Sequence, residues 1–184
     1  MFSLVLRGGH AVLLAGVIGL GVAPLAAQEP RPQTRQGFWI GFGFGVGSFG
    51  CQGCEHRLTG GSGYFRLGGT VSQTVLLGVE TNAWSKDEEG ASLVVTQLNS
   101  VAYLYPRASS GFHFKVGVGL ATIDIDAAPF GGRESGAGLL LGLGYDGRIG
   151  RNVSLVPFLN LLAASVDGGS PSNMVQVGLG LSWH

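Results

Sequence analysis

The residues with the most chemical promise lie in one short segment, Cys51–His56, which reads Cys-Gln-Gly-Cys-Glu-His. Two thiols at this spacing can form a disulfide where the compartment is oxidising. Together with His56 they could instead supply three ligands to zinc, with Glu55 as a fourth only if its side chain bends inward. Covalent haem attachment would need a histidine directly after the second cysteine, and Glu55 occupies that position.

Other segments offer weaker chemistry. Gly45–Gly50 matches the spacing of a dinucleotide-binding loop, but no helix follows and the flanking residues alternate as a strand does. Triad catalysis needs a nucleophile beside a histidine and a carboxylate, and His56 and His113 have no evident serine partner. We therefore predict no catalytic residue, no cofactor and no metal. The alternative is an enzyme or a metal-binding protein that uses Cys51–His56.

Composition excludes several classes of protein. Charged residues make up 12% of the 184 residues, and glycine accounts for 34 of them. Soluble globular proteins have roughly a quarter charged residues and about 7% glycine, so a fully hydrated surface is not expected. The 11 basic and 11 acidic side chains cancel, which leaves no basic surface for nucleic acid. The length suits one domain, and no internal linker is evident.

The first segment predicts export. Arg7 and His10 precede an apolar run over residues 11–22, and small residues follow up to Ala27. This order is typical of a secretory signal peptide, and the run is shorter than the ~20 residues of a membrane-spanning helix. We predict a signal peptide over residues 1–27 and a disordered periplasmic lead-in over residues 28–36. Export favours the disulfide between Cys51 and Cys54 over the metal site.

Residues 37–184 alternate with a period of two. The last such segment alternates large apolar residues with small or polar ones. In a helix, this pattern would place both kinds of residue on every face, whereas in a strand each kind has its own face. Eight segments can be distinguished, each able to cross an outer membrane as a tilted strand. They lie around residues 38–47, 64–71, 74–84, 93–105, 112–123, 137–145, 153–166 and 174–183. The segment 153–166 is the weakest, because Pro157 cannot donate a ladder hydrogen bond.

The two faces of these segments differ in polarity. One face carries large apolar residues, and the other carries glycine, small polar residues and isolated charges. A charge facing lipid at the midplane costs about 2 to 4 kcal/mol, so we expect the apolar face to meet lipid. The interior of an eight-stranded barrel is just wide enough for side chains. We therefore predict a filled barrel in which Arg66, Glu80 and Lys115 form an ion cluster that holds the core together.

The segments between the strands should follow the usual asymmetry of outer-membrane barrels. We predict longer outside loops at 51–62, 85–90, 124–133 and 167–172, and shorter periplasmic joins at 72–73, 106–111 and 147–152. The outside is mildly acidic and could take up divalent cations that bridge lipopolysaccharide. Aromatic residues near the strand ends are predicted to form interfacial girdles: Trp39, Tyr64, Trp84, Tyr103, Tyr105, Tyr145 and Trp183.

Three stretches resemble the small outer-membrane β-barrel proteins of the OmpA, OmpX and OmpW type. They are residues 104–119, residues 142–157 and the alternating C-terminal strand, within a resemblance that spans roughly residues 37–184. Barrels of this family end in an aromatic residue read by the assembly machinery, although here His184 follows the tryptophan. The resemblance implies an insertion signal formed by Val175, Val177, Leu179, Leu181 and Trp183. Members serve structural, adhesive, permeability or defence roles, and a few are enzymes.

Together these observations predict an all-β protein, an eight-stranded antiparallel up-and-down transmembrane β-barrel in the cell outer membrane. We expect a structural or surface-interaction role without enzymatic activity. The expected partners are outer-membrane lipid, lipopolysaccharide and the outer-membrane assembly machinery, with no nucleic acid, and the barrel is expected to be a monomer. The alternatives are an outer-membrane enzyme or metal-binding protein using the first outside loop, and a soluble periplasmic lipocalin-like binding barrel.

Overall fold

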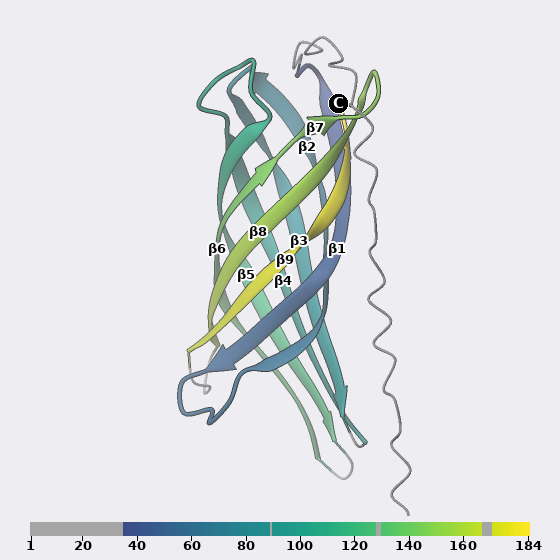
Figure 1. The fold of residues 1–184 in the computed structure, drawn as a ribbon. Helices are drawn as coiled ribbons and strands as arrows, with labels where there is room; N and C mark the ends of the chain where they lie inside the picture. Colours follow the sequence, from purple (N-terminus) through teal and green to yellow (C-terminus); the bar gives the residue numbers. More distant parts are fainter. Residues whose placement is uncertain (1–34, 89, 128–129, 167–170) are drawn as a thin grey trace, which may run out of the picture. The chain divides into compact units, whose positions relative to one another are not determined.

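A computed structural model describes residues 35–88, 90–127, 130–166 and 171–184. The predicted signal peptide and residues 28–34 of the predicted lead-in lie outside the described residues. Figure 1 shows the strands, which are β1 (Phe38–Cys51), β2 (Leu58–Ser72), β3 (Val75–Glu88), β4 (Ala91–Leu104), β5 (Phe112–Ala127), β6 (Phe130–Tyr145), β7 (Gly147–Arg148), β8 (Val153–Val166) and β9 (Ser172–Trp183). In this part of the chain, no helix has the length and apolar character needed to span a membrane.

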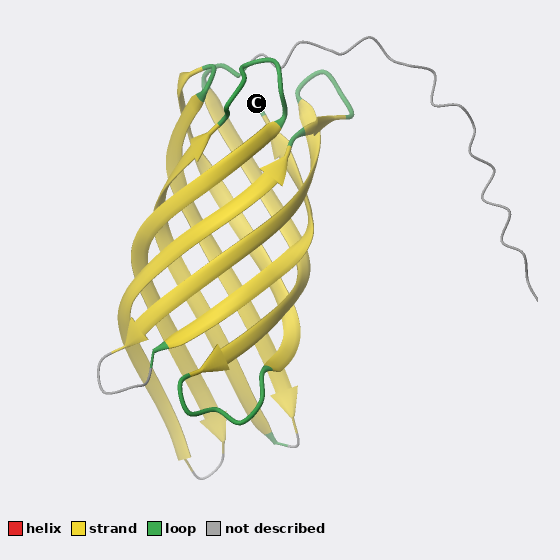
Figure 2. Ribbon diagram, turned by 60° about the vertical axis from the view of Figure 1, so that its left-hand side comes forward, coloured by secondary structure: helices red, strands yellow, loops and turns green. Residues whose placement is uncertain are grey.

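The strands form one closed antiparallel sheet. Hydrogen-bonded neighbours run in the order β6, β5, β4, β3, β2, β1, β9, β8, and β8 pairs back onto β6. The result is a closed barrel of strands (Figure 2). Eight of these strands are long, and the two-residue β7 is added beside the start of β8. Closure gives every long strand a partner on both sides, which removes the unpaired sheet edges that lipid cannot satisfy. The predicted fold class is confirmed.

The period of two places the faces of the wall as predicted. Phe44 and Leu120 point outward with 71% and 68% of their surface exposed, whereas Glu80 on the inner face is fully buried. Large apolar side chains are exposed on all eight long strands, and together they form an apolar belt around the barrel. A belt of this extent would aggregate in water and is typical of a lipid-facing surface. A lipocalin-like barrel needs the opposite arrangement and is therefore incompatible with this wall.

Most of the aromatic residues assigned to girdles lie inside the barrel instead. Five side chains are at most 5% exposed, namely Trp39, Tyr64, Trp84, Tyr103 and Tyr105. Tyr145 is 49% exposed, and Trp183 lies on the outer face with its ring 5.7 Å from that of Phe42. The girdle prediction is wrong for the five buried residues, because they occupy inward positions of their strands. Nearness to a strand end did not reveal which face they share.

Glycine makes room for these inward rings. A Cβ atom on Gly47 would lie 2.5 Å from Cδ1 of Trp84, and the indole N–H of Trp84 donates to the Gly47 carbonyl at 3.0 Å. Cβ atoms on Gly68 and Gly78 would lie 2.7 and 2.8 Å from Cζ2 of Trp39. Real carbon atoms do not approach so closely, so these positions accept no larger residue without displacing a ring. At these three positions, glycine is therefore a packing requirement of the interior.

Pro157 lies where its missing N–H interrupts no ladder. The pairing of β8 with β6 ends at Gly144 and Phe158, and its pairing with β7 begins at Leu155. Pro157 falls in the break between these two ladders while β8 still pairs with β9. This break explains how a proline is accommodated in a strand at the centre of the sheet.

The connections do not follow the predicted asymmetry. We call the end carrying the β1–β2, β3–β4, β5–β6 and β8–β9 connections the outer end, and the opposite end, next to the C-terminus, the periplasmic end. The loops predicted at 85–90 and 124–133 are largely strand, since β3 runs to Glu88 and β5 pairs with β6 as far as Ala127 and Phe130. The alternating residues 123–126 extend the hairpin beyond the belt. The longer β4–β5 connection, residues 105–111, lies at the periplasmic end.

The close fit between glycine and rings leads to a stability prediction. The change Gly47→Ala should lower the free energy of unfolding by about 1 to 3 kcal/mol, the usual cost of overpacking a filled core. Gly61→Ala is the matched control on the neighbouring strand, because no atom lies within 4 Å of its added Cβ. Urea unfolding in lipid vesicles measures both. Equal effects of the two changes would contradict the packing account.

Candidate functional site

The interior contains three layers of side chains along the barrel. Successive inward residues of β3 show the order, since Glu80, Asn82 and Trp84 are all fully or almost fully buried. The ionic layer, at the periplasmic end, consists of Arg66, Glu80, His113, Lys115 and Asp146. The amide layer follows with Asn82, Gln97, Asn99, Asn160 and Gln176. The apolar layer, toward the outer end, contains Phe49, Trp84, Val95, Ile123, Leu162 and Met174.

A buried ion pair anchors the ionic layer. Lys115 Nζ donates to Glu80 Oε1 at 2.5 Å, and both side chains are almost completely buried. The hydroxyl of Tyr103 donates to the other oxygen of the same carboxylate. Burying two charges is offset only when their remaining hydrogen-bonding groups are also satisfied. The tyrosine supplies that third partner, so the arrangement acts as a cross-link between β3, β4 and β5.

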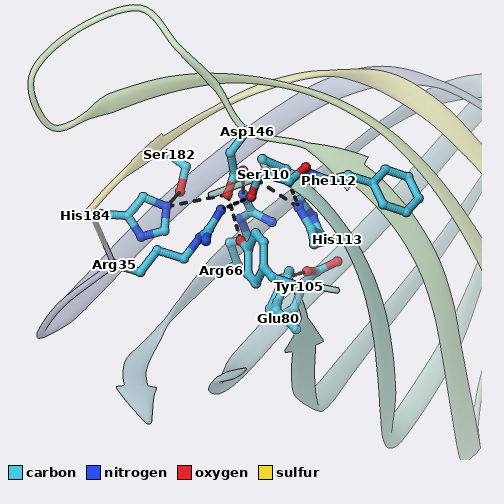
Figure 3. Close-up of polar contacts among 12 residues, drawn as sticks. Arg35, Arg66, Glu80, Tyr105, Ser110, Phe112, His113, Asp146, Ser182 and His184 are labelled. Carbon is cyan, nitrogen blue, oxygen red and sulfur yellow. Dashed lines mark hydrogen bonds and ion pairs between the residues drawn. The ribbon is translucent and has the colours of Figure 1, made fainter. Parts of the chain in front are cut away.

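Asp146 is the second centre of the ionic layer (Figure 3). Its carboxylate lies 3.8 Å from Arg66 Nη2 and 3.9 Å from His113 Nδ1. The Tyr105 hydroxyl donates to it at 2.7 Å, and the ring of His184 approaches to 3.8 Å. Asp146 follows directly after β6, and His184 follows β9. The layer therefore ties the residues that directly follow two strands to the barrel interior.

The structure brings the three predicted cluster residues into one layer but divides them between two centres. Arg66 and Glu80 are directly opposite each other on β2 and β3, and Glu80 pairs with Lys115. Arg66 instead forms an ion pair with Asp146. The alternation alone does not show that Asp146 pairs with Arg66 or that His184 approaches it, because Asp146 and His184 lie just past strand ends. Only the register of the closed sheet brings them together.

The environment at the periplasmic end sets the charges there. Burial alone would raise the pKa of Asp146, but the neighbouring His113 and Arg66 outweigh it and lower that pKa. Burial lowers the pKa of His184 to about 4, even though Asp146 opposes the shift. Burial, and then the nearby carboxylate, raise the pKa of Tyr105. At neutral pH this end thus holds an ionised carboxylate, a neutral His184 and a phenol that donates a hydrogen bond.

Arg35 departs from the predicted disorder of residues 28–36. It is fully buried, and its guanidinium donates to the carbonyls of Gln73 at 3.2 Å, Ala108 at 3.1 Å and Ser110 at 2.6 Å. The same group stacks 3.5 Å above the centre of the Tyr105 ring. The disorder was predicted because the segment is rich in polar residues and proline, and composition does not indicate this contact. Arg35 closes the periplasmic end by joining the β2–β3 and β4–β5 connections.

The amide layer separates the charged and apolar parts of the interior. Asn160 Nδ2 donates to Asn82 Oδ1 at 3.1 Å and to Gln176 Oε1 at 3.2 Å. A further bond of 2.8 Å joins Gln97 Nε2 to Asn99 Oδ1. Buried amides are stable when they find such partners. The layer spans the barrel from β3 to β8 and β9, so the centre is filled by hydrogen-bonded side chains.

The Cys51–His56 segment forms the first outer connection. Cys51 and Cys54 are joined by a disulfide with Cα atoms 5.3 Å apart, which removes both thiols as metal ligands. In the described part of the chain, no three His, Cys, Asp or Glu side chains gather in a way that could hold a metal ion. Arg57 turns away onto the outer face of the wall, where it donates to Ser48 and to Asn173 at 2.6 to 2.9 Å.

The residues predicted to form the insertion signal share the outer face of β9. Val177 and Leu179 are 51% and 57% exposed, and the inward residues Met174, Gln176 and Ser182 alternate with them in full burial or close to it. The outward residues are Val175, Val177, Leu179, Leu181 and Trp183. A lipid-facing stripe at the end of the chain is thus present. Its recognition by assembly machinery stays a prediction.

Comparison with known proteins gives likeness in structure rather than in sequence. No protein-family model and no curated protein matches the chain. Neisserial surface protein A superposes with a TM-score of 0.68 and 12% identity over 82% of this chain and 98% of its own. Ail, the attachment invasion locus protein of Yersinia pestis, superposes with a TM-score of 0.55 and 11% identity over 82% of this chain and 100% of its own. The outer membrane protein OprG of Pseudomonas aeruginosa superposes with a TM-score of 0.54 and 14% identity over 84% of this chain and 100% of its own.

The fold is that of the small outer-membrane β-barrels. This assignment rests on the shared closed barrel of eight long strands. The resemblance to small outer-membrane β-barrel proteins is confirmed at the level of fold. The exposed apolar belt on all eight long strands gives the same answer independently. The predicted location, the cell outer membrane, is confirmed by the fold and the belt together.

The ion pair predicts a strong and asymmetric mutational effect. Lys115→Met should destabilise the barrel by about 3 to 5 kcal/mol, because the Glu80 carboxylate would stay buried without its partner. The double change Lys115→Met with Glu80→Gln should recover part of that loss. Lys86→Met is the control, since Lys86 is partly exposed on β3. Urea unfolding of the four proteins provides the measurement, and a single change as mild as the control would refute the assignment.

Arg35 predicts a specific contribution from the segment that precedes β1. Arg35→Ala removes three hydrogen bonds to backbone carbonyls and a cation–π contact, so stability should fall by about 1.5 to 3 kcal/mol. Arg107→Ala, an exposed arginine at the same end, should change it by less than about 0.5 kcal/mol. Chemical unfolding distinguishes the two. Indistinguishable midpoints would show that Arg35 is not part of the fold.

Proposed function

We propose that the chain serves as a closed, non-conducting outer-membrane barrel with a structural and surface-interaction role and without enzymatic activity. The observation that carries this proposal is the filled interior. The ionic and amide layers occupy the barrel from wall to wall, with side chains from β2, β3, β5, β8 and β9 in mutual contact. A solute would have to break these buried contacts in order to pass.

The surface role is assigned to the outer end, where the hairpins extend past the belt. Their described charges are mostly acidic, with Lys86, Asp87 and Glu88 on β3, and Asp124 and Asp126 on β5. Asp124 is held by Arg133 at 3.3 Å on an exposed face. Such a surface favours cationic partners, including divalent ions that bridge lipopolysaccharide. It offers little to a polyanion.

The structural neighbours support a surface role in general but not a shared ligand. Neisserial surface protein A and the attachment invasion locus protein Ail carry surface roles in their names. Ail is also known in complex with the heparin analogue sucrose octasulfate. The acidic outer end of this chain argues against transfer of that ligand, because sulfates and carboxylates repel each other. We propose a cationic partner for this surface.

The alternative of an enzyme or metal-binding protein depends on the first outer connection. With Cys51 and Cys54 engaged in a disulfide, zinc binding there would require reduction of that bond. His56 and Glu55 remain, and they are too few for a structural zinc site. We therefore assign this connection a binding or structural role.

The remaining expected partners fit the same proposal. The apolar belt suits outer-membrane lipid, and the outward stripe on β9 suits recognition by the outer-membrane assembly machinery. A barrel with both sheet edges closed has no free edge at its centre for pairing with a second copy. We accordingly propose a monomer that contacts lipopolysaccharide through bridging divalent cations.

Conductance tests the proposal. Protein reconstituted in planar lipid bilayers should give no stepwise current at neutral pH, because the interior layers leave no water-filled path. A general porin in the same bilayer provides the positive control for the recording. A second control is the variant Lys115→Met, which shows whether loosening of the ionic layer admits ions. Steady unitary conductance of the wild-type protein would overturn the non-conducting assignment.

A further inference from the structure

An apolar cup opens at the outer end of the barrel interior. Its volume is about 700 Å³, which is within the range of small-molecule sites. The apolar part of its wall comes from inward positions of four strands and consists of Phe49, Leu58, Leu93, Ile123 and Ile125. Cys51 and Cys54, held by their disulfide, border it on one side. The apolar layer below, in which Phe49 stacks on Trp84 at 5.3 Å, forms the floor.

The cup keeps apolar side chains in contact with water. In residues 123–126 the aspartates point outward, and Asp124 pairs with Arg133 there, while the isoleucines point inward. This part of the hairpin lies beyond the β6–β8 pairing, which begins at Gly136 and Val166. The inward side chain of Ile125 is therefore not covered by the opposite wall and is 49% exposed. Leaving large apolar groups hydrated forfeits about 25 cal/mol for each Å². A ligand with an apolar body would recover that free energy.

The charges around the cup select the polar end of such a ligand. Glu55 and Glu134 line it, and none of its described lining residues is Lys or Arg. Lys86 is a counter-charge beside the cup, because it lies opposite Leu93 in the β3–β4 ladder. Arg57 is held on the outer face by Ser48 and Asn173. The described residues around the opening of the cup therefore carry more negative than positive charge, which favours a cationic group in the ligand.

We propose that the cup binds a small single-chain amphiphile that has an apolar tail and a cationic amine head. The tail would lie against Leu93, Ile123 and the floor, and the amine would lie between the carboxylates of Glu55 and Glu134. This inference deepens the proposed surface role by naming a ligand class, and it rests on the filled interior for its floor. Failure of the binding test and appearance of conductance are separate outcomes, so the two proposals can fail independently.

Titration calorimetry with three eight-carbon probes tests the inference. The protein is reconstituted in phospholipid nanodiscs, and empty nanodiscs correct for partitioning into lipid. n-Octylamine should bind saturably at one site. n-Octanoate has the same chain length but should bind at least about tenfold more weakly, because the carboxylates of Glu55 and Glu134 attract the ammonium group and repel the octanoate carboxylate. n-Octanol should fall between them.

Two matched pairs of variants locate the site. Leu93→Trp fills the cup and should abolish saturable binding, whereas Val94→Trp, the next residue on the opposite face, should not. The pair Glu55→Gln with Glu134→Gln should weaken octylamine about three- to tenfold. Asp87→Asn with Asp126→Asn removes the same charge from the outward faces and should have little effect. Retention of the heat-dependent mobility of a folded barrel verifies each variant.

Any other result overturns the inference. The wild-type protein could show no saturable binding, or could bind octanoate as well as octylamine. Binding could also survive Leu93→Trp or respond equally to both carboxylate pairs. If Leu93→Trp does not fold, the two carboxylate pairs still decide the outcome, because all four residues are exposed to water in the folded barrel.

Discussion

A closed sheet of eight long strands surrounds a volume that must be filled by its own inward side chains, and the packing of aromatic rings against glycine is how this chain fills it. Trp39 and Trp84 are large enough to span much of the interior, and they fit because Gly47, Gly68 and Gly78 face them without a Cβ. The same rings then wall off the polar groups below and between them. The Trp39 ring packs edge-on against Tyr103, whose hydroxyl donates to Glu80, so the aromatic packing and the ionic layer are in direct contact.

The change of polarity along the interior connects the fold to its proposed role. Charges are concentrated at the periplasmic end of the interior, where Arg35 stacks on the Tyr105 ring and His184 lies against Asp146. Amides occupy the centre, and apolar groups continue to the outer mouth. A barrel built only for stability could place polar groups at a mouth that faces water. Isoleucine stands there instead, and the proposed binding of an amphiphile at the outer end rests on this feature.

Much of the architecture follows from the period of two residues, because alternation assigns each side chain to lipid or interior without knowledge of the register. That is why the outward positions of Phe44 and Leu120 and the burial of Glu80 could be predicted. The ion-pair partners could not, because Asp146 meets Arg66 only through the order and stagger of the closed sheet. The rings were misassigned because closeness to a strand end says nothing about face, although Trp39 shares the alternation of the inward glycines. Arg35 was missed because its contacts are with backbone carbonyls distant in the sequence.

The most direct test of the central claim is fractionation of cells that express the protein, followed by gel electrophoresis of the outer-membrane fraction with and without boiling. A closed, tightly filled barrel resists detergent until it is heated, so the account predicts that the protein is found in the outer membrane and that its mobility changes on boiling. Recovery from the soluble periplasmic fraction with no change in mobility would contradict both the lipid-facing belt and the filled interior.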